Sequence, residues 1–95
     1  MDLNPASVDH TLVLPREHLE NIYELPEKKF AKMALVIKRV CDAVKKTIGA
    51  EGITILQLNG SAAGQVVMHF HVHVIPRFRE DSISEVLGVI GGIRG

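Results

Sequence analysis

Apolar residues recur at two different spacings along the chain, and each spacing predicts a different kind of element. Between Pro26 and Ile48 they return every three or four positions, at Phe30, Met33, Ala34, Ile37, Val40, Cys41, Val44 and Ile48. This spacing places them on one face of a helix. Pro26 suits the first helical position and Gly49 suits the end. The pattern therefore predicts one long helix over residues 26–48.

Three other segments have the alternation or the β-branched content of strands, at residues 10–14, 52–58 and 66–77. Residues 4–7 predict a turn, residues 16–25 a short helical turn or loop, and residues 59–64 a loop of small side chains. This order of elements predicts an α+β fold with a mainly antiparallel sheet, covered on one face by the helix. We expect residues 1–95 to form a single domain. In its tail, residues 82–95, the capping-box spacing of Ser82 and Glu85 predicts a short helix, and the remainder is flexible or packs against a partner.

Composition narrows the classes of function. Hydrophobic residues make up 46% of the chain, a high share for a small domain. Such a chain leaves apolar surface exposed unless another subunit covers it, which favours a homo-oligomer. Eleven basic and eleven acidic residues cancel, so no basic surface for nucleic acid is expected. No apolar run approaches the roughly 20 residues of a membrane span, and the start of the chain has no signal-peptide pattern. A single cysteine excludes an internal disulfide, so we expect a cytoplasmic protein with no membrane partner.

The segment from His69 to Val74 carries the candidate chemistry. His69, His71 and His73 occupy alternate positions, so on a strand their imidazoles share one face while Phe70, Val72 and Val74 face the core. Three groups that titrate near neutral pH on one strand indicate metal ligation or proton and phosphoryl transfer.

Three interpretations of these histidines were weighed. A metal site is disfavoured because the first and third Cα atoms lie about 13 Å apart on a straight strand, too far to converge on one ion. A purely packing role is possible for one histidine but explains three in alternation poorly. A phosphate site uses the preceding loop, where Gly64 allows a close backbone approach to an anion and Gln65 adds a donor and an acceptor. A central histidine beside such a loop is placed to attack phosphorus, and no acidic cluster for a metal accompanies it.

Residues 64–77, GQVVMHFHVHVIPR, resemble the signature of the histidine triad (HIT) family, in which Gly-Gln precedes His-apolar-His-apolar-His. Upstream, residues 2–7 and 10–18 are similar to the family's nucleotide-binding turn and strand. The likeness extends from about Asp2 to Arg77. It implies a HIT-like fold and a nucleotide hydrolase or transferase that acts at the α-phosphate, with no cofactor.

The resemblance also implies roles for individual residues. His71 would attack phosphorus and form a nucleotidyl-histidine, His69 would orient it, His73 would contact the phosphate or bridging oxygen, and His10 would support the triad. Asp2 would bind the ribose hydroxyls. The phosphate-contacting loop would be Gly64, Gln65, Val66 and Val67. The implied partners are a nucleotide, with a purine expected, and a second copy of the chain in a homodimer.

Three departures from the family pattern shape the expected activity. Leu58 stands where many members carry an amide, and Val66 stands where the phosphoramidase branch has serine. The given sequence starts at the Asp2 turn, which family members normally reach after two strands and the usual zinc ligands. We expect either a sequence truncated at its start or a minimal form with an open base pocket, and no structural zinc. We expect a phosphoramidase-like hydrolase of an adenosine nucleotide. The alternatives are a dinucleoside polyphosphate hydrolase and a nucleotide-binding or scaffold protein with little turnover.

Overall fold

The computed structural model describes the backbone of residues 2–5 and all of residues 10–79. The elements in chain order are β1 (Asp2–Pro5), β2 (Thr11–Leu14), the 3₁₀ turn η1 (Ile22–Glu24), α1 (Glu27–Ile48), β3 (Gly52–Leu56), the 3₁₀ turn η2 (Ser61–Ala63) and β4 (Val72–Arg77). The expected helix and tail over residues 82–95 lie outside the described residues. Within the described part, no helix is both long and apolar enough to cross a membrane.

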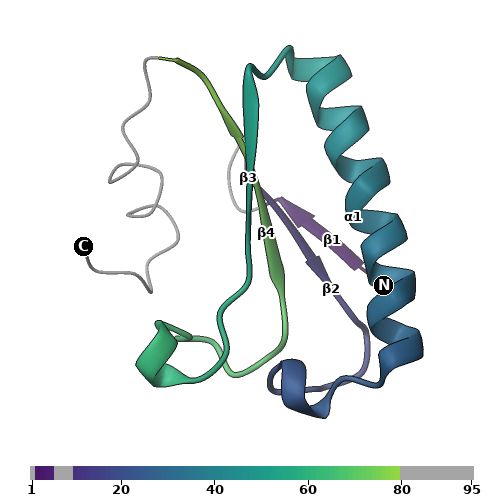
Figure 1. The fold of residues 1–95 in the computed structure, drawn as a ribbon, viewed down its shortest axis with the longest axis vertical. Helices are drawn as coiled ribbons and strands as arrows, with labels where there is room; N and C mark the ends of the chain where they lie inside the picture. The colour runs from purple at the N-terminus through teal and green to yellow at the C-terminus, as the bar shows by residue number, and fades with distance from the viewer. Residues whose placement is uncertain (1, 6–9, 80–95) are drawn as a thin grey trace.

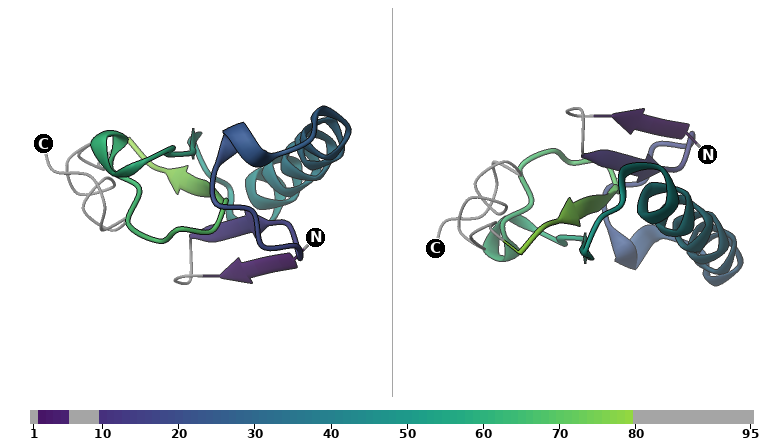
Figure 2. Two further views of the ribbon diagram at one scale, coloured as in Figure 1. Left: turned by 90° about the horizontal axis from the view of Figure 1, so that it is seen from below. Right: turned by 90° about the horizontal axis from the view of Figure 1, so that it is seen from above.

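The strands form one antiparallel sheet in the order β1-β2-β4-β3. The helix α1 packs against β2, β4 and β3 on one face, so the molecule has two layers (Figures 1 and 2). This arrangement confirms the predicted α+β class and the β3–β4 pairing across the small-residue loop. Because β4 lies between β2 and β3, its residues are the most enclosed positions of the sheet.

The helix α1 follows its sequence signals closely. Pro26 is the residue before the first turn, and Gly49 ends the helix in the left-handed conformation, with φ 73° and its N–H bonded to the Lys45 carbonyl. Met33 is buried, and Ile37 is among the helix residues that pack beside it on the core. The ends of the predicted stripe are not covered by the described residues: Phe30, Ala34 and Ile48 are exposed.

The core confirms the alternation at the end of the histidine segment. Phe70, Val72 and Val74 are at most 3% exposed and pack with Val13, Met33 and Leu25 in one cluster. Burying these side chains supplies most of the apolar contact between the sheet and α1. It also forces the intervening positions, 71 and 73, towards the opposite face, where the helix does not reach.

Two of the predicted strands are longer than the strands in the structure. The strand predicted over residues 66–77 begins only at Val72, and residues 67–69 bend instead. The reason is the partner strand: Val13 pairs with Val72, and β2 ends one residue later, at Leu14, where Pro15 has no N–H for a ladder.

The other two differences lie at the ends of the predicted segments. Of the turn predicted over residues 4–7, the first two residues belong to β1, which pairs with β2 from Asp2 opposite Leu14 to Pro5 opposite Thr11. Residues 6 and 7 lie outside the described residues. The strand predicted over residues 52–58 ends at Leu56. In each case, pairing with a neighbouring strand decided where regular structure starts and stops.

Candidate active site

The histidines gather around the start of β4. His73 is in the strand, opposite Leu12 of β2 and Leu56 of β3, and His71 directly precedes the strand. His10 directly precedes β2. The rings of His71 and His73 lie edge to face, with centroids 4.8 Å apart, and the rings of His10 and His73 have centroids 5.0 Å apart. Three of the four predicted catalytic residues therefore form one continuous row of imidazoles.

His71 has a defined tautomer. Its Nδ1–H donates to the backbone carbonyl of His69 at 2.6 Å. In the neutral imidazole, a proton on Nδ1 leaves the lone pair on Nε2. The backbone thus fixes both the rotation of the ring and the nitrogen that can act as a nucleophile. In His71 it is Nε2 that stays free to attack, because Nδ1 carries the proton.

His10 and His73 form a buried pair. They are 3% and 5% exposed, and His10 Nε2 lies 2.9 Å from His73 Nδ1. Burial, followed by the influence of His71 and then His10, lowers the pKa of His73 from its ordinary 6.5 to about 4. Burial, followed by the influence of His71, also lowers the pKa of His10. Both imidazoles are therefore neutral at neutral pH, as a shared N–H···N hydrogen bond requires.

The proton in this pair is best assigned to His10 Nε2. His10 Nδ1 is buried and has no hydrogen-bond partner among the described residues. A buried N–H without a partner is rarer than a buried acceptor without one, so Nδ1 is the bare nitrogen and Nε2–H donates to His73. His73 then carries its own proton on Nε2. A neutral N–H donor is thereby held beside the His71 ring.

His69 differs from the sequence-based expectation. Its ring Nε2–H donates to the Pro15 carbonyl at 3.2 Å, and its Nδ1 lies 3.3 Å from Nδ1 of His18. The ring is thus occupied at the end of β2, and its link to His71 runs through the backbone carbonyl. The prediction that residue 69 lies in the strand was wrong, because β4 begins only at Val72, but the His69 ring lines a cavity together with His71. From the sequence, His18 was included only in the family-like stretch of residues 10–18 and was given no role at the site.

The loop before the histidines is organised by Gly64 and Gln65. Gly64 ends η2 with φ 96°, a conformation that favours glycine. The Gln65 side chain is 3% exposed and fully engaged: Oε1 accepts from Gly60 N–H at 2.7 Å, and Nε2 donates to the carbonyls of Glu20 and Val67. Its carboxamide therefore supports the loop from inside.

The two valines that follow are presented outwards. Val66 and Val67 are 67% and 59% exposed. Within the described part of the chain, their backbone N–H groups donate to no protein acceptor. Two consecutive N–H groups without internal partners are suited to bind anionic oxygens. Their position is next to His71 along one wall of a common cavity.

Two adjoining cavities meet at His71. The smaller, of about 30 Å³, lies among Leu58, Gly64, Gln65, Val66, Val67, His71 and His73. The larger, of about 310 Å³, is lined by Leu12, Leu14, Val67, His69 and His71. The first has room for a single small group beside the N–H donors, and the second falls at the lower end of small-ligand pockets. Leu58, which stands where many family members carry an amide, lines the smaller cavity.

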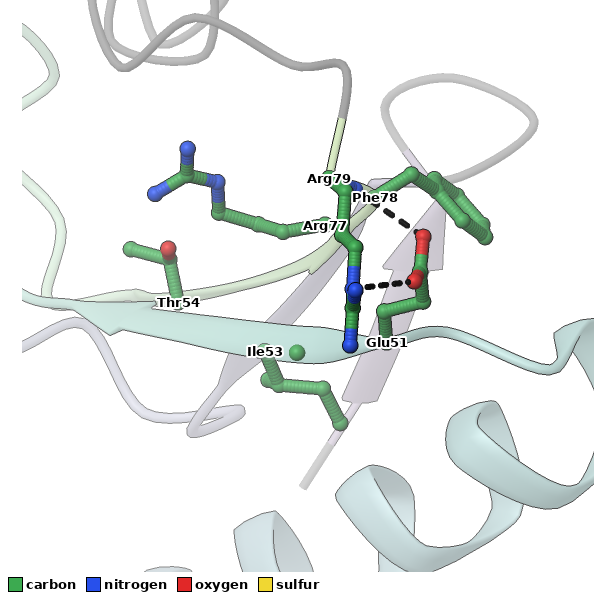
Figure 3. Close-up of a pocket in the computed structure, with 7 residues that line it drawn as sticks. Glu51, Ile53, Thr54, Arg77, Phe78 and Arg79 are labelled. Atoms are coloured by element: carbon green, nitrogen blue, oxygen red, sulfur yellow. Dashed lines mark hydrogen bonds and ion pairs between the residues drawn. The ribbon is translucent and has the colours of Figure 1, made fainter.

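The largest described cavity lies away from this chemistry. It has a volume of about 340 Å³ and lies at the far ends of β3 and β4 (Figure 3). Arg79 faces Glu51 there and pairs with it at 3.0 Å, while the Arg77 side chain extends towards Thr54. Its lining contains neither a histidine nor a cysteine. The reactive groups are therefore confined to the opposite end of β4.

Two further predictions concern ligands. The side chain of Asp2, expected at the ribose, lies outside the described residues, which include only its backbone in β1. Among the residues described, no three His, Cys, Asp or Glu side chains form a group that could hold a metal ion. The imidazole pairing at His10–His73 and the carbonyl contacts of His69 and His71 already use four ring nitrogens within the protein.

Comparison with known proteins agrees with this geometry. The sequence profile of the HIT domain matches residues 1–80. The chain is 38% identical over 81 residues to an adenosine 5′-monophosphoramidase of Schizosaccharomyces pombe, covering 85% of this chain and 58% of that protein. It is 36% identical over 83 residues to an adenylylsulfatase of Arabidopsis thaliana, covering 87% of this chain and 42% of that protein.

A solved structure is similar in fold as well as in sequence. A hypothetical histidine triad nucleotide-binding protein from Sulfolobus tokodaii superposes with a TM-score of 0.74 at 42% identity, covering 85% of this chain and 54% of that one. The chain thus spans about half the length of these relatives. Profile, sequence and fold agree, and the chain belongs to the HIT-domain family.

Proposed function

We propose that this chain, as one domain, hydrolyses an adenosine nucleotide at its α-phosphate through a nucleotidyl-His71 intermediate, with a phosphoramidate as substrate. The observation that carries the proposal is the hydrogen bond from His71 Nδ1–H to the His69 carbonyl. It leaves the Nε2 lone pair as the nucleophile. The His71 ring lies next to the His73 ring, with centroids 4.8 Å apart, and lines the same cavity as Val66 and Val67. Two relatives are named an adenosine 5′-monophosphoramidase and an adenylylsulfatase. These names support a substrate in which the leaving group is attached to the phosphate of an adenosine nucleotide.

The proposed reaction has two steps. His71 Nε2 forms a bond to the α-phosphorus, and the bond to the leaving nitrogen breaks with its electron pair on that nitrogen, which takes up a proton from the solvent and departs as ammonia. Water then attacks the same phosphorus and gives up a proton to the solvent, which releases the nucleoside monophosphate and restores the neutral imidazole. The N–H groups of Val66 and Val67 bind the phosphate oxygens, where charge grows in the transition state.

His73 and His10 act as neutral partners in this scheme. With a pKa of about 4, His73 does not carry a positive charge at neutral pH, so its Nε2–H donates a hydrogen bond to a phosphate or bridging atom. His10 holds it in that tautomer through the 2.9 Å contact. The base and ribose would occupy the 310 Å³ cavity beside Leu12 and Leu14, with Asp2 at the ribose. We further propose a homodimer and a cytoplasmic location.

Substrate comparison tests the proposal. The chain is expected to hydrolyse adenosine 5′-phosphoramidate with a higher kcat/KM than diadenosine tetraphosphate, measured side by side by release of adenosine monophosphate. The opposite ratio would assign it to dinucleoside polyphosphates. Nucleotide binding without turnover of either compound, and surviving His71→Ala, would identify a binding protein and contradict the enzymatic proposal.

A further inference from the structure

Two segments far apart in the sequence are tied together at the end of the molecule that holds the site. We call residues 15–26 the connecting segment and residues 57–71 the β3–β4 loop; the turns that they contain, η1 and η2, lie at the same end of the fold (Figure 1). Besides the contacts of the His69 ring with Pro15 and His18, three hydrogen bonds join them. Asn59 Oδ1 accepts from Ile22 N–H at 2.8 Å, Gln65 Nε2 donates to the Glu20 carbonyl at 2.6 Å, and Phe70 N–H donates to the Leu19 carbonyl at 2.6 Å.

Asn59 is held in the one orientation that makes its bond possible. Its Nδ2 donates to Gln57 Oε1 at 2.7 Å, and its Oδ1 accepts from Gln57 Nε2 at 2.7 Å. This reciprocal amide pair leaves Oδ1 directed at the Ile22 N–H. Asn21, its neighbour across the gap, serves only its own segment by capping η1 at Tyr23 N–H. Asn59 is therefore a side-chain tie from the base of the loop to the connecting segment.

Hydrogen bonds between Gly60 and Gln65 connect Asn59 to the backbone of Val66 and Val67. Asn59 precedes Gly60, whose N–H donates to Gln65 Oε1 at 2.7 Å and whose carbonyl accepts from Gln65 N–H at 3.0 Å. Gln65 precedes Val66, one of the two residues with outward N–H groups. Gly60 and Gly64 have φ of 85° and 96°, so the loop has little intrinsic rigidity of its own. Its shape depends on these hydrogen bonds.

We propose that Asn59 is a positioning residue for the reaction at His71, which tethers the β3–β4 loop to the connecting segment and thereby sets the Val66 and Val67 N–H groups against His71 Nε2. The inference rests on the proposed function. Donors that stabilise developing charge must be in place before the reaction, and a displacement of about 1 Å can cost up to about a hundredfold in rate. Asn59 acts only through the loop, so its loss lowers kcat rather than nucleotide affinity.

The kinetic test uses three variants. Asn59→Leu has a similar shape but cannot accept from Ile22 N–H, and is expected to lower kcat by about 10- to 30-fold with KM within about twofold. Asn59→Asp keeps an oxygen that accepts from Ile22 N–H and from Gln57 Nε2, and loses only the bond that Asn59 Nδ2 donates to Gln57 Oε1, so it is expected to stay within about threefold of the parent. Asn21→Ala removes a comparable hydrogen bond within the connecting segment and is expected to leave kcat unchanged.

A second readout does not depend on turnover. Amide hydrogen exchange of Ile22, Gln65 and Phe70 is expected to accelerate in Asn59→Leu, while the amides of α1 keep their rates. Unchanged kcat in Asn59→Leu, a change in KM alone, or no recovery in Asn59→Asp would overturn the positioning role. Unchanged exchange would overturn the tether itself. If the parent chain turns over no nucleotide, the proposed function fails, and the exchange rates still decide whether Asn59 holds the loop.

Discussion

His71→Ala is expected to reduce hydrolysis of adenosine 5′-phosphoramidate by a factor on the order of 10⁴ to 10⁶ in kcat. The substitution removes the only protein atom that the proposed scheme bonds to phosphorus. The backbone donors of Val66 and Val67 and the His10–His73 pair remain, so nucleotide binding should change little. Steady-state kinetics under saturating substrate, with nucleotide affinity measured separately, distinguish lost chemistry from lost binding.

The matched control is His18→Ala. His18 is a second histidine of the same region, but it contacts His69 and lines neither of the two cavities that meet at His71. We expect a loss of less than about tenfold in kcat, because the backbone carbonyl that orients His71 is retained. Activity of His71→Ala within about a hundredfold of the parent would show that another group attacks phosphorus.

Unfolding stability is expected to fall by on the order of 3 kcal/mol as the pH drops from about 6.5 to about 4, through the buried His10–His73 pair. The pKa of His73 is lowered to about 4 in the folded chain, against 6.5 in the unfolded one. Between these values the unfolded state binds more protons than the folded state. The stabilisation is therefore complete above pH 6.5 and is lost as the pH falls towards the folded pKa.

The double variant His10→Gln/His73→Asn isolates this effect. The Gln amide stands in for Nε2 of His10 and the Asn amide for Nδ1 of His73, so the hydrogen bond between the two positions can persist without a titrating group. Urea unfolding of both proteins at half-unit pH steps should give a steep slope for the parent and a shallow one for the variant. Parallel slopes would mean that the pair is not the source of acid sensitivity.

The buried side of the histidine segment and the end of α1 could be predicted from the sequence, because both depend on local patterns. Phe70, Val72 and Val74 were predicted to face the core from alternation alone, and all three are buried. The left-handed Gly49 ended α1 where the apolar stripe ended. Both features follow from side-chain periodicity and from the conformations open to glycine, and neither requires knowledge of a distant partner.

The limits of the strands were not readable, because they depend on which strand lies alongside. The histidine strand was extended too far in the prediction, since its start is set by Pro15, the residue directly after β2 and more than fifty residues earlier. The segment Asp2–Pro5 contains turn-forming residues and nevertheless forms β1 against β2. Pairing with a neighbour outweighed local propensity in both places.

The hydrogen-bond partners of the site were hidden for the same reason. The His69 ring contacts the Pro15 carbonyl, and the Gln65 side chain contacts the Glu20 carbonyl. Backbone carbonyls have no sequence signature, so the residue types predicted a site but not how each side chain is used. Asn59 was assigned only to a turn, although its Asn-Gly context also suits a residue whose side chain organises the loop.

The most direct test of the central claim is to trap the covalent intermediate. The chain is mixed with adenosine phosphoramidate labelled at the α-phosphate, quenched at alkaline pH within a single turnover, and digested for peptide mapping. The account predicts label on His71 that appears before adenosine monophosphate is released, decays as it is released, and is absent from His71→Ala. A complete single turnover in which His71 never carries the label would contradict it.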